Sequence, residues 1–317
     1  MSKTILCDEL KSKLDKFRPF PPETLASLRN YYRVGLTWSS NALEGNSLTE
    51  SETKVIIEDG LTVQGKPLHE VYEALGHAEA YDYIHAMSVN KELEITEILK
   101  LHELFYKRIN PEQSGKFRQV KVFISGSRYS LPSPEKITGL MDEFIKWLNK
   151  NENSMHPVLL AAEAHKRFVF IHPFVDGNGR VARLLMNLLL IRHGYPVAII
   201  PPILRAEYIS LLEIAHHTPE RFIDFIIDRE IETLRELLRL LGDENSIPVE
   251  NEMSPEAEKL LQILKNNPGL RVPELINRLQ KSRPTVERYL RLLRKHDLIE
   301  FRGAPKNGGY FVKQDKV

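Results

Sequence analysis

Apolar residues recur at three- and four-residue spacing through most of the chain, which is the pattern of amphipathic α-helices. Six segments before residue 220 carry this pattern: Val71–Met87, Glu94–Arg108, Lys136–Asn149, Val158–Phe170, Arg180–His193 and Ala206–His216. A further segment, Glu230–Leu241, is rich in Glu and Arg pairs and also has helical spacing. The pattern therefore predicts a body made mainly of α-helices.

One segment breaks the helical pattern. Val120-Lys-Val-Phe-Ile124 is a short apolar run, and Ser-Gly-Ser-Arg separates it from Tyr129-Ser-Leu131. β-Branched and aromatic residues on both sides of a glycine-containing turn are typical of a β-hairpin. We therefore predict a hairpin with Gly126 in its turn, ended by the prolines that follow Leu131.

A polar stretch at residues 242–252 separates this body from a second pattern. Three helical segments and two short strands follow the stretch, at Pro255–Asn266, Val272–Gln280, Pro284–His296, Leu298–Arg302 and Tyr310–Val312. Three helices and a terminal hairpin predict a small winged helix-turn-helix domain, which we assign to residues 253–317.

The charge of the chain is unevenly distributed. The whole sequence has a formal net charge of +1, but residues 253–317 hold 14 Lys/Arg against 7 Asp/Glu, which leaves +7 there and −6 in the remainder. A basic domain favours a nucleic acid partner. Cys7 is the only cysteine, so no intrachain disulfide is expected. Without a signal-peptide pattern or an 18-residue apolar run, we expect a cytoplasmic protein that does not cross a membrane.

The most informative segment begins where an apolar run reaches His172-Pro173. Proline disfavours helix in the residue before it, so a loop should open there. The following Asp176-Gly-Asn-Gly179 lets the backbone approach a ligand, and the next helix presents unpaired N–H groups and a positive dipole end. Arg180 and Arg183 share one face of that helix, where two guanidinium groups suit a polyphosphate.

The same loop holds a base and a metal ligand. His172 is ionisable near neutral pH, and Asp176 offers the hard oxygen atoms that Mg²⁺ prefers when it bridges phosphates. The combination predicts attack of a hydroxyl group on a nucleotide phosphate, with His172 accepting the hydroxyl proton.

The segment from His172 to Arg183 resembles the Fic family signature His-Pro-Phe-x-Asp-Gly-Asn-Gly-Arg-x-x-Arg, and all nine fixed positions match. The resemblance implies a helical Fic core, at residues 96–242, that transfers AMP from ATP to a Ser, Thr or Tyr hydroxyl of a target protein. It implies that His172 is the general base and Asp176 the Mg²⁺ ligand. The implied phosphate contacts are the anion hole of Gly177, Asn178 and Gly179, and Arg180 and Arg183 at the β- and γ-phosphates.

Two residues of the signature carry further implications of the resemblance. Phe174 is similar to the residue that anchors the loop in the core. Gly179 stands where a kinase-like branch of the family has Lys, which favours transfer of a nucleotide over transfer of a phosphate.

The resemblance extends to Gly115-Lys-Phe-Arg118, directly before the predicted hairpin. The hairpin is similar to the family's flap, whose exposed strand edge holds a target segment by main-chain pairing. The flap residues implied are Val122, Phe123, Ile124, Ser125 and Gly126.

A second motif lies in the N-terminal helical region, which we assign to residues 1–95. Ser40 and Glu44 are one helical turn apart and Gly45 follows them. Alone this is a short amphipathic turn with a glycine stop. In context it resembles the family's inhibitory motif, in which Glu44 would pair with Arg183 and hold ATP in a non-productive pose. The same glutamate helps water to remove AMP in some family members, so de-modification of the target stays open.

Several alternatives also stay open. The segment Ser282 to Lys295 is shaped like a recognition helix and includes the basic residues Arg283, Arg288, Arg291, Arg294 and Lys295. These side chains suit DNA phosphates, but winged helices also serve as protein contacts or homodimer interfaces. A second function class is a transcription regulator whose Fic-like core only senses nucleotide. The donor could also be UTP or another nucleotide.

Other histidines could be metal ligands by residue type. His102 and the pair His216-His217 lack a second histidine at the spacing that a zinc helix needs, so packing is favoured for them. His165 lies seven residues before His172, and support of that residue is one interpretation of it.

Overall fold

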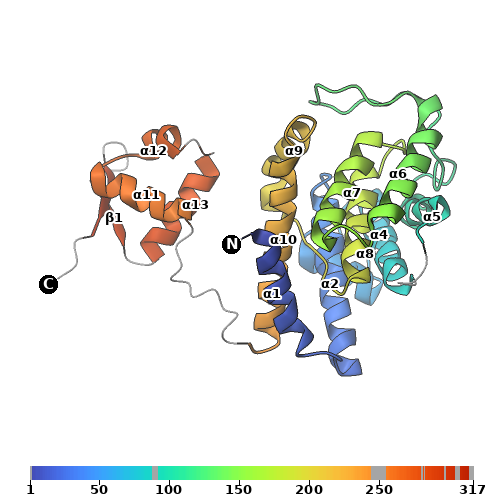
Figure 1. The fold of residues 1–317 in the computed structure, drawn as a ribbon, viewed down its shortest axis with the longest axis horizontal. Coiled ribbons are helices and arrows are strands. Elements are labelled where there is room, and N and C mark those ends of the chain that lie inside the picture. Colours follow the sequence, from blue (N-terminus) through green and yellow to red (C-terminus); the bar gives the residue numbers. More distant parts are fainter. Residues whose placement is uncertain are drawn as a thin grey trace. The chain divides into compact units, whose positions relative to one another are not determined.

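The structure is a computed structural model that describes residues 2–87, 92–243, 255–279, 281, 283–295, 298–303 and 308–313. Two compact units make up the chain, Met1–Asp243 and the remainder (Figure 1). Three residues of the predicted winged-helix segments lie outside the described residues, namely Gln280, Ser282 and His296.

The first unit is helical, as the periodicity predicted. Its α-helices are α1 Lys3–Asp15, α2 Pro22–Ala42, α3 Glu50–Lys54, α4 Leu68–Ala86, α5 Ile95–Tyr106, α6 Ile137–Asn151, α7 Pro157–Ile171, α8 Asn178–Arg192, α9 Arg205–Ile214 and α10 Pro219–Leu240. A π-helix, Val55–Asp59, continues α3, and short 3₁₀ turns at Pro134–Lys136 and Pro202–Leu204 precede α6 and α9. Helix α10 begins at Pro219, earlier than the predicted start at Glu230.

The core of this unit is built around α7 and α8, which pack against each other along their length. Helix α8 also contacts α2, α4 and α5 (Figure 1). Most of its residues are buried, from Val181 to Leu190. A helix that is buried on most of its surface is stable only when other elements surround it. Its N-terminal turn is therefore held rigidly by the surrounding helices.

The strand pairing predicted for residues 120–131 is absent from the structure. The segment is a loop in which Ser127 N donates to Ile124 O at 3.2 Å and Gly126 has a φ of +84°. The turn therefore lies where we predicted it, but no ladder flanks it. Phe123 is 90% exposed, so the alternating apolar residues have no core to cover. A two-stranded hairpin without such burial is at best marginally stable.

The loop is instead tied to α9. Glu213 accepts hydrogen bonds from Ser127 Oγ at 2.9 Å and from Arg128 N at 2.7 Å. The ring of Tyr129 stacks on His216, with centroids 3.6 Å apart, and His216 stacks on Phe170 of α7 at 3.8 Å. These contacts bring the loop to the C-terminal end of α7. The aromatic stack also accounts for His216 by packing, as the sequence favoured.

The second unit is a winged helix, which confirms the predicted class. It contains α11 Pro255–Asn266, α12 Val272–Leu279, α13 Arg283–Lys295, β1 Ile299–Arg302 and β2 Gly309–Val312. The two strands are antiparallel, with Ile299 opposite Val312. The unit has its own apolar core, which includes Leu260, Leu275, Val286 and Leu293.

Across the described residues, none of the helices combines the length and the apolar character needed to cross a membrane.

Candidate active site

His172 terminates α7 in a left-handed backbone conformation, with φ 51° and ψ 60°. It is the one non-glycine residue with positive φ in the described part of the chain. Such a conformation costs about 1–3 kcal/mol and persists where surrounding contacts hold it. His172 N donates to Phe168 O at 3.0 Å, and Arg118 Nε donates to His172 O at 2.8 Å. The strained residue is thus fixed from both sides.

The ring of His172 is held in one tautomer. Nδ1 lies 3.3 Å from Val169 O. Because a carbonyl oxygen only accepts, Nδ1 must carry the hydrogen, which leaves the lone pair on Nε2. Burial, reinforced by the charge of Arg118, lowers the pKa of His172 to about 4. The ring is therefore neutral near pH 7, as a general base requires.

The loop after His172 is closed by Asn178. Its Oδ1 accepts from Phe174 N and its Nδ2 donates to Phe174 O, both at 2.9 Å. This bonding uses Oδ1 and one hydrogen of Nδ2, while the main-chain N–H of Asn178 lies in the first turn of α8. The ring of Phe174 is fully buried, which fits the anchoring role that the resemblance implied.

His102 of α5 contacts the same loop. Its ring stacks on Phe174 with centroids 3.8 Å apart and an interplanar angle of 3°. Nε2 donates to Asp176 O at 3.2 Å, and Nδ1 accepts from Gly115 N at 3.0 Å. Packing was the correct interpretation of His102, but its contact with the loop was not predicted. In the sequence, only the Gly115–Arg118 motif, whose first residue bonds to His102, pointed toward this contact.

The first turn of α8 is the candidate anion site. Gly177 is its N-cap, with a φ of +78°, and Asp176 Oδ1 accepts from Gly177 N at 2.6 Å. The N–H groups of a first helical turn lack carbonyl partners within the helix and carry its positive dipole end. A Cβ on Gly179 would lie 2.2 Å from Glu44 Oε1. Glycine at 179 therefore admits a carboxylate to this end of the helix.

Arg183 is buried, and the chain itself satisfies its guanidinium. Nε donates to Ser40 Oγ and Nη2 to Ser40 O, both at 2.9 Å. Nη2 also donates to Glu44 Oε1 at 2.6 Å, and Nη1 to Tyr208 Oη at 3.1 Å. The contact expected between Glu44 and Arg183 is present.

The pKa of Glu44 is held below its ordinary value. Partial burial works to raise this pKa, but the guanidinium groups of Arg183 and Arg180 outweigh it. Glu44 is therefore an ionised partner of Arg183. Its side chain remains 35% exposed, against 2% for Arg183, so Glu44 is the partner that is free to move.

A hydrogen-bonded chain continues from Arg183 to His165. Tyr208 of α9 accepts from Arg183, and its hydroxyl lies 3.0 Å from His165 Nε2. Because burial lowers the pKa of His165 to about 3, this ring is neutral and Nε2 accepts the Tyr208 proton. His165 therefore supports Arg183 and not His172. Tyr208 was not predicted.

Arg180 has an acidic partner that the sequence did not reveal. Its Nη1 donates to Glu73 Oε1 of α4 at 2.6 Å, and its guanidinium lies 4.3 Å from the centre of the Phe105 ring. Asp176 lies farther away, at 3.4 Å. Asn46 Nδ2 donates to Glu73 Oε2 at 2.8 Å. Each of the two signature arginines therefore faces a carboxylate of the N-terminal region.

Asp176 fits a metal that arrives with a nucleotide. Its side chain is 55% exposed at the mouth of the anion site. Within the described residues, no cluster of three or more His, Cys, Asp or Glu side chains forms a metal cage. Mg²⁺ commonly uses one or two carboxylates together with substrate phosphates and water. The donor set therefore suits Mg²⁺ shared with a polyphosphate.

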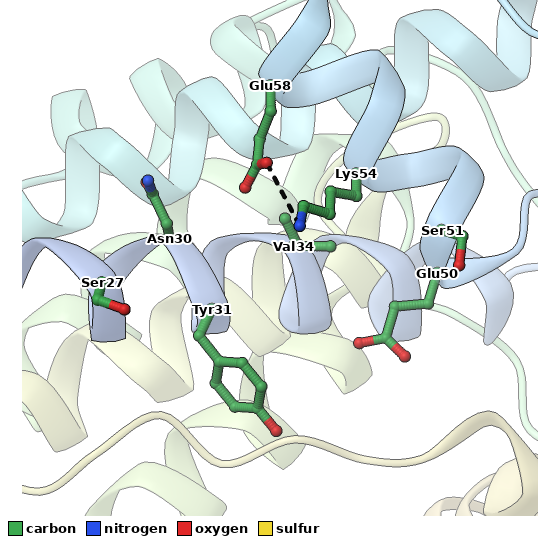
Figure 2. A pocket seen from close by; sticks show the side chains of 8 residues that line it. All are labelled: Ser27, Asn30, Tyr31, Val34, Glu50, Ser51, Lys54 and Glu58. Atoms are coloured by element: carbon green, nitrogen blue, oxygen red, sulfur yellow. Dashed lines mark ion pairs between the residues drawn. The ribbon is translucent and has the colours of Figure 1, made fainter.

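A separate cavity of about 500 Å³ lies along α2 and α3 (Figure 2). Its lining residues are Ser27, Asn30, Tyr31, Val34, Glu50, Ser51, Lys54 and Glu58. Figure 2 shows Lys54 turned toward Glu58, and their ion pair spans 3.8 Å. The cavity includes neither His172 nor the two arginines, so it is not the anion site.

Two family models match this chain. Residues 92–190 match the Fic/DOC family, and residues 257–300 match a family described as winged helix-turn-helix DNA-binding. The chain therefore contains a Fic/DOC family domain, and a winged helix-turn-helix follows it.

Curated relatives are named protein adenylyltransferase Fic. The protein of Drosophila grimshawi is 42% identical over 200 residues, which cover 62% of this chain and 41% of the relative. That of Drosophila willistoni is 39% identical over 241 residues, with 75% and 48% covered. The chain thus spans less than half the length of these relatives.

Solved structures share the fold. A Fic domain containing signaling protein from Bacteroides thetaiotaomicron has a TM-score of 0.69 and 27% identity, covering 75% of this chain and 98% of that one. Fic-1 residues 134–508 from C. elegans gives a TM-score of 0.68 and 28% identity, with 76% and 72% covered.

Proposed function

We propose that this chain is a protein adenylyltransferase, which transfers AMP from ATP to a Ser, Thr or Tyr hydroxyl of a target protein. One observation carries the proposal. His172 is neutral and its Nε2 atom has a lone pair that can accept a proton. The short loop that follows His172 leads directly to the N-terminus of α8, which bears Arg180 and Arg183. The names of the relatives support the same activity.

In the proposed reaction, His172 Nε2 takes the proton of the target hydroxyl. The hydroxyl oxygen then attacks the α-phosphorus, a new oxygen–phosphorus bond forms, and the bond to the bridging oxygen of the leaving pyrophosphate breaks. The first-turn N–H groups of Gly177, Asn178 and Gly179 face the charge that develops on the phosphate. Arg180 and Arg183 hold the β- and γ-phosphates. Mg²⁺ held by Asp176 would supply further neutralisation of phosphate charge.

We further propose that Glu44 restrains this reaction. The pair that it forms with Arg183 occupies the guanidinium that the γ-phosphate requires. ATP would then be bound in a pose that does not align the α-phosphorus with the target oxygen, which lowers the rate. Ser40 contributes by accepting hydrogen bonds from two nitrogen atoms of the same guanidinium, Nε and Nη2. The resting chain should therefore be a slow enzyme.

The test compares auto-modification by labelled ATP in the original chain, in Glu44→Gly and in Glu44→Gly with His172→Ala. Replacement of the glutamate should raise transfer by about tenfold or more, since one charge-assisted contact is worth about 1.5–3 kcal/mol. The added alanine should abolish transfer. Glu50→Gly, in the separate cavity, is the matched control and should leave the rate unchanged. Release of AMP from the modified chain reports the reverse activity.

A second function, DNA binding by the winged helix, is favoured by exposed cations on α13. Arg291 and Arg294 are both exposed, and the segment matches a DNA-binding family. Phosphate contacts make affinity fall steeply with salt. Duplex DNA titrated at two salt concentrations should show that slope, and Arg291→Ala with Arg294→Ala should reduce it. A salt-independent affinity would favour a protein-contact or homodimer role.

The regulator alternative differs in one measurable respect. A chain that only senses nucleotide would bind ATP and yet transfer nothing, even without Glu44. Competition by UTP against labelled ATP tests the choice of donor nucleotide. A cytoplasmic location stays a prediction from the single cysteine.

A further inference from the structure

Arg118 is a fully buried cation that has no part in the proposed reaction itself. It lies between α5 and the loop of residues 119–132, and its side chain is 0% exposed. Burial lowers its pKa, because removing a charge from water is unfavourable unless hydrogen bonds replace the lost solvent. The side chain must therefore be retained at this position by specific partners.

The partners of the guanidinium are three main-chain carbonyl groups. Nη1 donates to Val120 O at 3.0 Å and Nη2 to Pro132 O at 2.6 Å. Nε donates to His172 O at 2.8 Å. The main chain adds a fourth contact, since Arg118 N donates to Pro173 O at 2.9 Å. One side chain thus bonds both ends of the loop and the backbone of the proposed base.

The geometry of the guanidinium explains why arginine is required. Its planar fork presents donors in several fixed directions, whereas the ammonium of lysine is a compact point charge. Lysine at 118 could serve one or two of the three carbonyls, and methionine none. Any carbonyl that stays buried without a partner costs about 1–3 kcal/mol. The His172 carbonyl matters most, because its left-handed backbone has to be held against strain.

We propose that Arg118 is a positioning residue, which holds the backbone of His172 at a fixed position relative to loop 119–132. The loop carries the exposed apolar residues Val120, Phe123 and Ile124, whose side chains are available to a target segment. Because the same guanidinium closes the base of this loop and holds the His172 carbonyl, a target on the loop and the lone pair of Nε2 are aligned by one residue. The inference rests on the proposed function.

The kinetic test uses Arg118→Met and Arg118→Lys in the Glu44→Gly chain. Arg118→Met should lower kcat by about tenfold to a hundredfold, because displacement of a reacting group by about 1 Å costs up to a hundredfold. KM for ATP should stay within about twofold, since the arginines of α8 are untouched. The kcat of Arg118→Lys should lie between that of the Glu44→Gly chain and that of Arg118→Met. Arg167→Met, on the exposed side of α7, is the matched control and should keep both constants.

A readout independent of activity separates this inference from the proposed function. Nitrogen chemical shifts of labelled histidine rings report the tautomer, and His172→Ala identifies the signal. The original chain should show His172 with its hydrogen on Nδ1, and both Arg118 variants should shift it toward a mixture. If Arg118→Met does not fold, the lysine variant gives both readouts.

The kinetic and spectroscopic outcomes each decide the matter. A changed His172 signal with reduced kcat and constant KM supports the inference. A changed signal in a chain that transfers no AMP supports the positioning of His172 and removes the proposed function alone. An unchanged signal, a raised KM with constant kcat, or an equal loss in Arg167→Met would overturn it.

Discussion

In the proposed reaction, Arg180 and Arg183 must exchange hydrogen-bond partners before they can hold the phosphates of ATP. Arg183 is bonded to Ser40, Glu44 and Tyr208, and Arg180 is bonded to Glu73. A γ- or β-phosphate therefore competes with a carboxylate that is already in contact. Charge-assisted pairs of this kind are the strongest hydrogen bonds in proteins. Under the proposed function, we expect the affinity for ATP to depend on these internal pairs as well as on the two arginines.

Glu73 offers a test of that competition. Glu73→Gln removes the charge but keeps the size and hydrogen-bonding ability of the side chain. ATP should then bind the Glu44→Gly chain about threefold to tenfold more tightly, since about 0.7–1.4 kcal/mol of competition is lost. Calorimetric titration measures the Kd. Glu79→Gln on the same helix, where Glu79 pairs with Lys107 and Arg108, is the control. Weaker binding in Glu73→Gln would show instead that Glu73 orients Arg180.

At the scale of elements, α4 to α9 were predictable, whereas α1, α2 and α3 and the contacts between helices were not. Apolar residues at three- and four-residue spacing identified α4 to α9. The loop at 119–132 was predicted as a hairpin from local composition, yet its side chains have no core to cover. Partners such as Arg118, His102, Glu73 and Tyr208 come from different helices and loops, and nothing in their local sequence indicates pairing. The signature loop was recognisable because its residues are contiguous.

A buried carboxyl group without a hydrogen-bond partner lies where α1 packs against α10. Glu230 is fully buried, neither of its carboxyl oxygens has a hydrogen-bond partner, and burial raises its pKa well above the ordinary value. Burial, together with the nearby Glu230, raises the pKa of the Cys7 thiol of α1 to about 12. Glu230 is therefore protonated in the folded chain at a pH where it is ionised in the unfolded chain.

This difference predicts a pH-dependent stability. Between the ordinary pKa of glutamate and the raised pKa of Glu230, the folded chain binds the extra proton, so stability falls as pH rises through that window. Glu230→Gln should remove this fall and increase the free energy of unfolding at pH 8 by about 1–3 kcal/mol. Denaturant unfolding at pH 5 and pH 8 measures both effects. Glu232→Gln, exposed on the same helix, should change neither, and a decrease in Glu230→Gln would refute the account.

At the scale of the whole molecule, each of the two compact units has its own apolar core. All the residues of the proposed reaction and of its restraint lie in the first unit. The sequence predicts a boundary at residues 242–252, from a polar stretch and a change in charge. The boundary drawn at residue 95 within the first unit stays a prediction.

The independence of the first unit can be tested by ending the chain at Asp243. In the Glu44→Gly background this shorter chain should melt in a single transition and keep its auto-modification rate within about twofold, because its core and site are complete. DNA affinity should be lost with the second unit. A large loss of transfer would instead assign the second unit a part in catalysis.

The most direct test of the account is the rate of AMP transfer from labelled ATP in three chains measured side by side: the original, Glu44→Gly, and Glu44→Gly with His172→Ala. The account predicts a low rate, a rate raised by about tenfold or more, and no transfer. Equal rates in the first two chains would contradict the restraint by Glu44. Transfer that persists without His172 would contradict the assignment of the base, and with it the central claim.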